Sequence, residues 1–154
     1  MLTVRKAVPQ DAVLLAANLR PDDIAELNAS GVPDIELTIR EGIEESEECY
    51  VAVSEGDIPE IVFGVVATED PIVGAIWMLG TPAIENNWVQ VLRETRQWLN
   101  KLFGDYKLLG NAVWSGNRIH IRWLRWAGFT FLREVPVGDH VFYEFAALNL
   151  QEIT

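Results

Sequence analysis

The sequence predicts an α/β or α+β domain, with a central mixed, mostly antiparallel sheet of about seven strands flanked by helices. Strand-like and helix-like segments alternate along most of the chain. Three strands near the middle are separated only by turn residues, which favours an antiparallel meander. In the second half, the order strand, long helix, strand, helix, strand permits a crossover connection. With 154 residues, we expect a single domain, 1–154.

The composition excludes several classes of protein. Hydrophobic residues make up 49% and charged residues 23% of the chain, which indicates a packed domain rather than disorder. The formal net charge of -11 argues against general binding to nucleic acid and suits a protein that docks on a basic partner. Arg5, Lys6 and Asp11 interrupt any apolar N-terminal stretch, so no signal peptide and no membrane span are expected. A lone cysteine, Cys49, excludes an internal disulfide and indicates a reducing compartment.

The first half is predicted to hold a strand, three short helices and three further strands. The helices begin at Asp11, Pro21 and about Ile35, and the second one ends at Gly31. A run of glutamates in the third helix indicates a solvated face. The predicted strands cover residues 2–8, 50–53, 61–67 and 72–79.

A long amphipathic helix is the clearest element of the second half. Thr81 is predicted as its N-cap and Pro82 as its first residue, and Phe103–Gly104 as its end. Asn117 is predicted to cap a shorter helix that stops at Gly128. The apolar stripe of the long helix comprises Ile84, Trp88, Val91, Thr95, Trp98 and Leu102. The remaining predicted strands cover residues 107–114, 129–135 and 141–148.

The segment from Asn117 to Phe129, N-R-I-H-I-R-W-L-R-W-A-G-F, resembles the late helix of the GNAT (Gcn5-related N-acetyltransferase) family. That family has an Asn after its fifth strand, a short helix, and Gly-Phe entering its sixth strand. The order of elements matches over nearly the whole chain. The resemblance implies a GNAT-like acyltransferase fold, with acetyl-CoA as the cofactor of an active member.

A second resemblance, to a tailed-phage family, covers roughly residues 2–131 in the order of elements, with its specific residues between Ile76 and Phe129. Residues 76–81, the long helix, residues 111–114, Asn117 and residues 121–124 are similar to the internal (core) virion protein A family of podophages, which itself looks GNAT-like. This resemblance implies a phage protein of virion assembly, the internal core or the tail. Its partners would be other phage virion or assembly proteins, and its location the host cytoplasm during assembly or the virion.

Acetyl transfer in this family needs a pyrophosphate cradle, which the resemblance places between the fourth strand and the long helix. Small residues there let backbone N–H groups approach the phosphates at a helix N-terminus. This junction reads L-G-T-P-A-I-E, with a single glycine and no leading Gln or Arg. Pro82 removes one donor, and Glu85 places a negative charge in the first turn.

The other catalytic groups are missing from the expected positions as well. Many family members carry a tyrosine acid four residues before the Gly of Gly-Phe, where this chain has Leu124. The fourth strand has no ionisable side chain, and Glu60 and Glu69 only flank neighbouring strands, which leaves a base that acts through water as the alternative. We therefore expect a non-catalytic protein, without catalytic residues, cofactor or metal. The alternative is an acetyl-CoA-dependent N-acetyltransferase with a divergent loop, whose cofactor-binding residues would be Leu79, Gly80, Thr81 and Asn117.

The late helix is the candidate contact surface. Its arginines recur every three or four residues, which predicts a basic stripe that balances acidic neighbours, docks an acidic partner or is the relic of a cofactor site. Exposed Trp is enriched at interfaces, and Trp123 and Trp126 cannot both face the core with Leu124. His120 is expected to be partly exposed and Cys49 to lie at a strand edge. A third option is a small-ligand or host-modulating protein that uses the cleft between the fourth and fifth strands. The predicted partner-binding residues are Arg118, Arg122, Trp123, Arg125 and Trp126.

Overall fold

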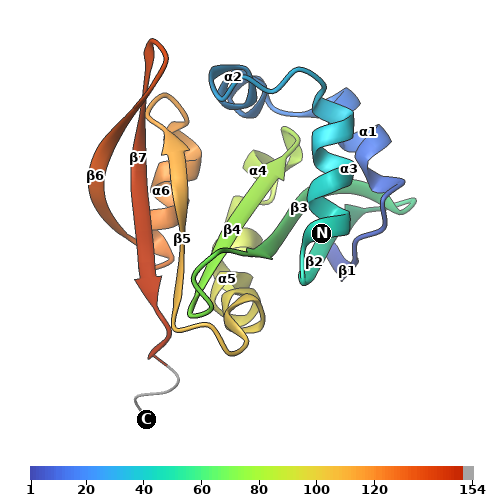
Figure 1. The fold of residues 1–154 in the computed structure, drawn as a ribbon. Helices are drawn as coiled ribbons and strands as arrows, with labels where there is room; N and C mark the ends of the chain where they lie inside the picture. The colour runs from blue at the N-terminus through green and yellow to red at the C-terminus, as the bar shows by residue number, and fades with distance from the viewer. Residues whose placement is uncertain (151–154) are drawn as a thin grey trace.

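A computed structural model describes residues 1–150 and shows one seven-stranded sheet flanked by helices (Figure 1). The strand order is β1-β2-β3-β4-β5-β7-β6. Only β4 and β5 run parallel, and every other neighbouring pair is antiparallel. The predicted mixed, mostly antiparallel sheet of an α+β fold is confirmed. The strands are β1 (Thr3–Lys6), β2 (Glu48–Ser54), β3 (Ile58–Ala67), β4 (Val73–Gly80), β5 (Leu108–Trp114), β6 (Thr130–Val137) and β7 (His140–Leu148).

Helices cover both faces of the sheet. Successive residues of β3 and β4 point to opposite faces, and they contribute to two separate cores. One core packs α1 and α3 against Val62 and Leu79, and the other packs α5 and α6 against Ile61, Val65 and Ile76. No helix within residues 1–150 is long and apolar enough to cross a membrane. The helices are α1 (Asp11–Asn18), α2 (Pro21–Ala29), α3 (Ile35–Glu45), α4 (Ala83–Asn86), α5 (Trp88–Phe103) and α6 (Arg118–Trp126).

The long helix predicted after β4 is divided in two at Asn87. This residue leaves the helical region with φ -117° and ψ 24°, and its side-chain amide donates to the carbonyl of Ala83. A side chain that bonds to nearby backbone in this way competes with helix propagation. Pro82 is the N-cap of α4 and not its first residue. The prediction of one continuous helix from Thr81 was therefore wrong, although its apolar stripe does face the core.

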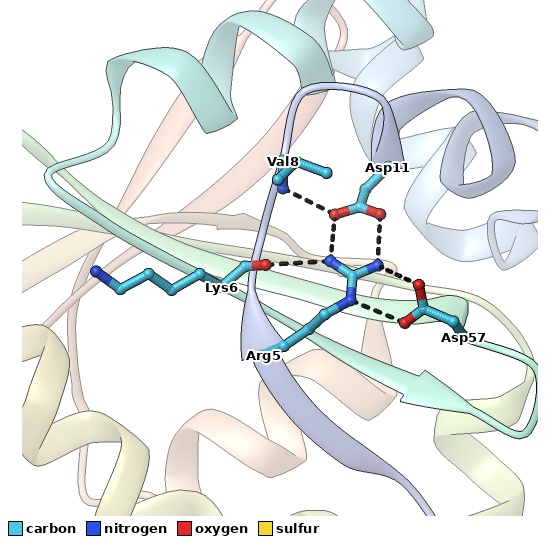
Figure 2. A network of polar contacts seen from close by, with 5 residues as sticks. All are labelled: Arg5, Lys6, Val8, Asp11 and Asp57. Atoms are coloured by element: carbon cyan, nitrogen blue, oxygen red, sulfur yellow. Dashed lines mark hydrogen bonds and ion pairs between the residues drawn. The ribbon is translucent and has the colours of Figure 1, made fainter.

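Arg5 of the N-terminal strand β1 ties this strand to two other segments of the chain (Figure 2). The Arg5 guanidinium donates two hydrogen bonds to Asp11 at the start of α1, and its Nε donates to Asp57 in the β2–β3 turn. Partial burial alone would raise the pKa of Asp11. The bonds from Arg5 and from the Val8 amide outweigh that effect and hold the pKa below its usual value. Arg5 thus joins β1, α1 and the β2–β3 turn.

The sheet opens between β4 and β5. These strands pair only from Val73 to Ala75 on β4 and from Leu108 to Gly110 on β5. Beyond that point β4 stays paired with β3 as far as Gly80, and β5 stays paired with β7 as far as Trp114. The two halves of the sheet therefore diverge towards the carboxyl ends of β4 and β5 (Figure 1).

His120 is less accessible than predicted, whereas Cys49 lies near the end of its strand, as expected. Cys49 is the second residue of β2, which lies between β1 and β3. Its burial raises the pKa of the thiol to about 12, which makes it a poor nucleophile near neutral pH. His120 is buried on the inner face of α6, where Trp123 is its aromatic neighbour. The amphipathic pattern of α6 turns His120 and Trp123 towards the core. The arginines between and around them in the sequence made this pattern hard to recognise.

Candidate functional site

The divergence of β4 and β5 creates a cleft of about 360 Å³ through the sheet. Ala75 to Leu79 of β4 form one wall, and Asn111 and Ala112 of β5 form the other. Helix α3 lines one mouth with Thr38, Gly42 and Glu45, and α6 lines the other. A concave site of this size between strands is the default location for a ligand.

Helix α2 closes the wide end of the cleft and contacts both of its walls (Figure 1). On the β4 side, the amide of Arg20 donates to the carbonyl of Gly80 at 2.9 Å. The amide of Gly80 donates in turn to Asp23 Oδ2 at 2.8 Å. On the β5 side, the amide of Trp114 donates to Glu26 Oε1 at 3.0 Å. One short helix thus satisfies the last backbone groups of both diverging strands.

A buried ion pair anchors α2 in this position. Arg20 Nη2 lies 3.0 Å from Asp23 Oδ1, and both residues are at most 4% exposed. The side-chain amide of Asn117, which is fully buried, donates to Asp23 and accepts from Arg20. The two charges therefore compensate each other. Asn117 and the Gly80 amide supply further hydrogen bonds, whereas the buried Arg20 Nε has no hydrogen-bond partner within residues 1–150. Asn117 is the N-cap residue of α6, as predicted, but its side chain makes no capping hydrogen bond to the helix and instead joins the ion pair.

Two further groups in the cleft have perturbed pKa values. Burial, together with the nearby Asp23 charge, raises the pKa of Glu26 to about 7. Burial lowers the pKa of His120 to about 4, so the imidazole is neutral at neutral pH. Glu26 is therefore the cleft carboxyl that can exchange a proton near neutral pH.

Backbone amides at the β4–α4 junction already donate within the protein. Thr81 donates to the Glu60 carbonyl at 2.8 Å, Ile84 to the Thr81 carbonyl at 3.1 Å, and Glu85 to the Pro82 carbonyl at 3.1 Å. Ala83 donates to the Thr81 hydroxyl at 3.2 Å, and Gly80 donates to Asp23 as described above. Pro82 has no amide hydrogen. No amide from Gly80 to Glu85 is left for a ligand.

These residues do not fit the pyrophosphate of coenzyme A. A diphosphate at a helix N-terminus is held by free N–H groups, and here the Asp23 carboxylate and nearby carbonyls are the acceptors. Two further features oppose the cofactor. The Asn111 side chain spans the cleft and donates to the Ile76 carbonyl at 2.8 Å. Leu124, at the expected position of the acid, is fully buried and has no proton to give.

The residues predicted for cofactor binding do lie close together, but in other roles. Leu79 packs in the α1/α3 core. Gly80 and Thr81 make the internal bonds given above, and Asn117 belongs to the ion-pair cluster. Sequence reasoning missed Asp23 and Glu26, which were assigned to an ordinary short helix. The available signal was their three-residue spacing, which places both on one face of α2.

The late helix exposes part of the predicted contact surface. Arg118, Arg122 and Arg125 are exposed, and Trp126 is 62% exposed. Trp123 is only 6% exposed, and its indole donates to the Thr95 hydroxyl at 2.8 Å in the core. Trp123 is therefore removed from the candidate surface, because α6 turns positions 120, 121, 123 and 124 towards the sheet.

Comparisons with known proteins give structural matches only. No protein-family model matches the chain, and no curated protein sequence is significantly similar to it. Aminoglycoside acetyltransferase AAC(6')-Ib, in complex with ribostamycin and coenzyme A, aligns with a TM-score of 0.73 and 18% identity, over 99% of this chain and 96% of that one. A putative phosphinothricin N-acetyltransferase aligns with a TM-score of 0.71 and 14% identity, over 96% and 98%.

A GNAT-family acetyltransferase of Streptococcus pneumoniae aligns over 96% of this chain and 99% of its own, with a TM-score of 0.65 and 17% identity. The structural alignments establish the fold, but sequence identities this low leave the activity open. The alignments cover 96–99% of this chain. The chain therefore has the GNAT fold of the Gcn5-related N-acetyltransferases.

Proposed function

We propose that this chain is a non-catalytic GNAT-fold protein that acts by binding other proteins. The observation that carries the proposal is the occupied junction between β4 and α4. Every available amide from Gly80 to Glu85 has an acceptor within the protein. To bind a diphosphate there, the protein would have to break several internal hydrogen bonds, including the bond from the Gly80 amide to the buried Asp23 carboxylate.

We further propose that the protein serves phage virion assembly, the internal core or the tail. The proposed role in virion assembly rests only on the resemblance of residues 76–129 to the podophage internal virion protein A family. Co-purification of the tagged chain with virion or assembly proteins from infected cells tests it. Recovery of host proteins alone, with no phage protein, would count against it.

A thermal-shift titration with acetyl-CoA tests the non-catalytic part. A ligand that binds only the native state stabilises it by about 2.7 kcal/mol at a hundredfold excess over Kd. For a domain of this size that corresponds to a rise in Tm of roughly 5–10 °C. We expect a shift below about 1 °C at millimolar acetyl-CoA. A shift of several degrees would contradict the proposal.

An N-acetyltransferase with a divergent loop is the second candidate. Two observations favour it: a cleft of about 360 Å³, and the Glu26 carboxyl with a pKa of about 7 at its wall. Such a pKa suits a group that exchanges a proton near neutral pH. Acetyl-CoA turnover with a panel of amines, compared with the Glu26→Gln variant, decides between the two candidates. Turnover that is lost in the variant would favour the enzyme.

A further inference from the structure

Helices α5 and α6 meet at a surface hollow whose charge is opposite to that of the whole protein. The hollow measures about 420 Å³ and is lined by Leu92, Arg93, Thr95, Arg96, Trp126 and Ala127. We propose that it docks an acidic peptide segment of a partner protein that also carries apolar side chains. This inference names the partner chemistry of the contact surface and rests on the proposed binding function.

The tryptophan at the hollow is both exposed and held in place. Trp126 keeps 62% of its surface exposed, while its indole N–H donates to the Leu92 carbonyl of α5 at 3.2 Å. An aromatic ring held in this way loses little conformational entropy when it contacts a partner. Val89, one turn before Arg93 on α5, is 68% exposed. Together they offer apolar contact area beside the arginines.

Six of the 12 lysines and arginines of the chain lie exposed on these two helices. Five of them are arginines, and the sixth, Lys101, lies over the Tyr50 and Trp98 rings. Within residues 1–150, none of the five has an ion-pair partner. Glu94 is the one acidic residue of α5 and α6, and it lines a separate apolar cavity beneath α5. The exposed surface of α5 and α6 is thus locally basic, on a chain of net charge -11, and Arg93 and Arg96 line the hollow itself. The five residues are Arg93, Arg96, Arg118, Arg122 and Arg125.

The chemistry of the surface favours a short acidic peptide over nucleic acid. Guanidinium groups pair with carboxylates through two parallel hydrogen bonds, and Trp and Arg are the residues most enriched at interface hot spots. Charges beyond about 8 Å are screened at physiological salt, so a short peptide on the hollow is largely shielded from the acidic remainder of the chain. A long polyanion would extend over that acidic surface and be repelled.

Nuclear magnetic resonance on the full 15N-labelled chain tests the proposal. The probe is a synthetic 12-residue peptide of Glu, Asp and Leu, and the comparison probes are a Lys/Leu peptide of the same pattern and a 12-nucleotide single-stranded DNA. We expect the acidic peptide to shift the indole resonance of Trp126, with a Kd of about 10–200 μM at low salt. The affinity should fall by about tenfold or more at 0.5 M salt.

Charge-removing variants locate the site. The combined variant Arg93→Gln, Arg96→Gln and Arg122→Gln should weaken peptide binding at least about tenfold, since each exposed charge pair contributes up to about 1 kcal/mol. Arg133→Gln is the matched control, because Arg133 is an equally exposed arginine on β6 that already pairs with Glu144. Its peptide affinity should not change.

Three outcomes would overturn the inference. They are an unmoved Trp126 indole resonance, DNA binding as tight as peptide binding, and shifts explained by self-association of the chain in sedimentation experiments. These results are independent of the acetyl-CoA titration. If the peptide does not bind and acetyl-CoA does not raise the Tm, only this inference is refuted. If acetyl-CoA raises the Tm, the proposed non-catalytic function is refuted, and the peptide result still stands.

Discussion

Replacing Asp23 with alanine tests how firmly α2 closes the cleft. The change removes the partner of a buried arginine 3.0 Å away. It also removes the acceptor of two hydrogen bonds, from the Gly80 amide at 2.8 Å and from the Asn117 side chain at 2.9 Å. Breaking a buried ion pair by deleting one partner costs about 3–5 kcal/mol, because the other charge stays buried without compensation.

Urea denaturation followed by tryptophan fluorescence measures this cost. For Asp23→Ala, the expected loss of about 3–5 kcal/mol corresponds to a drop in Tm of roughly 6–20 °C. Asp22→Ala is the matched control on the same helix, since Asp22 has no ion pair within the part of the chain that the structure describes. Its loss should stay below about 1 kcal/mol. Equal losses for the two variants would refute the closing role of Asp23.

Three further changes probe other parts of the molecule. Folding raises the pKa of Glu26 from 4.5 to about 7. The free energy of unfolding of the wild type should therefore fall relative to that of Glu26→Gln as pH rises between these two values, and then level off. A constant difference between the urea midpoints of the two proteins across this range would contradict this. Trp123→Phe removes the indole bond to Thr95 and opens space in the core, and calorimetry should show a loss of about 1–3 kcal/mol, against less than about 0.5 kcal/mol for exposed Trp126→Phe. Arg5→Met removes the guanidinium that lowers the pKa of Asp11 and leaves the Val8 amide bond in place, so titration by nuclear magnetic resonance should find the pKa of Asp11 higher. The stability difference from wild type should shrink as pH falls through the lowered wild-type pKa. An unchanged pKa would contradict this.

The sequence predicted the order of elements well because most of its signals are local. Strands separated by turns and amphipathic periodicity place strands and helices without tertiary information. The break at Asn87 escaped prediction because the apolar stripe continues from Ile84 into α5. Only the local contact between the Asn87 side chain and the Ala83 carbonyl reveals it.

The site was predictable only in part, because its key contacts join residues far apart in sequence. The L-G-T-P-A-I-E junction predicted a poor phosphate cradle. The structure adds a contact that the sequence did not predict, because Asp23 accepts a hydrogen bond from the Gly80 amide across 57 positions. Likewise, the pKa of Glu26 depends on burial between α2 and β5, which no local pattern encodes. The inward position of Trp123 follows from the docking of α6 on the sheet.

The amides of the β4–α4 junction offer the most direct test of the central claim. Acetyl-CoA can be titrated into the 15N-labelled chain while the resonances of Gly80, Thr81, Ala83, Ile84 and Glu85 are followed, with calorimetry on the same sample. The account predicts no measurable heat and no shift of these five resonances up to millimolar acetyl-CoA. A micromolar Kd together with shifts at three or more of these amides would contradict it.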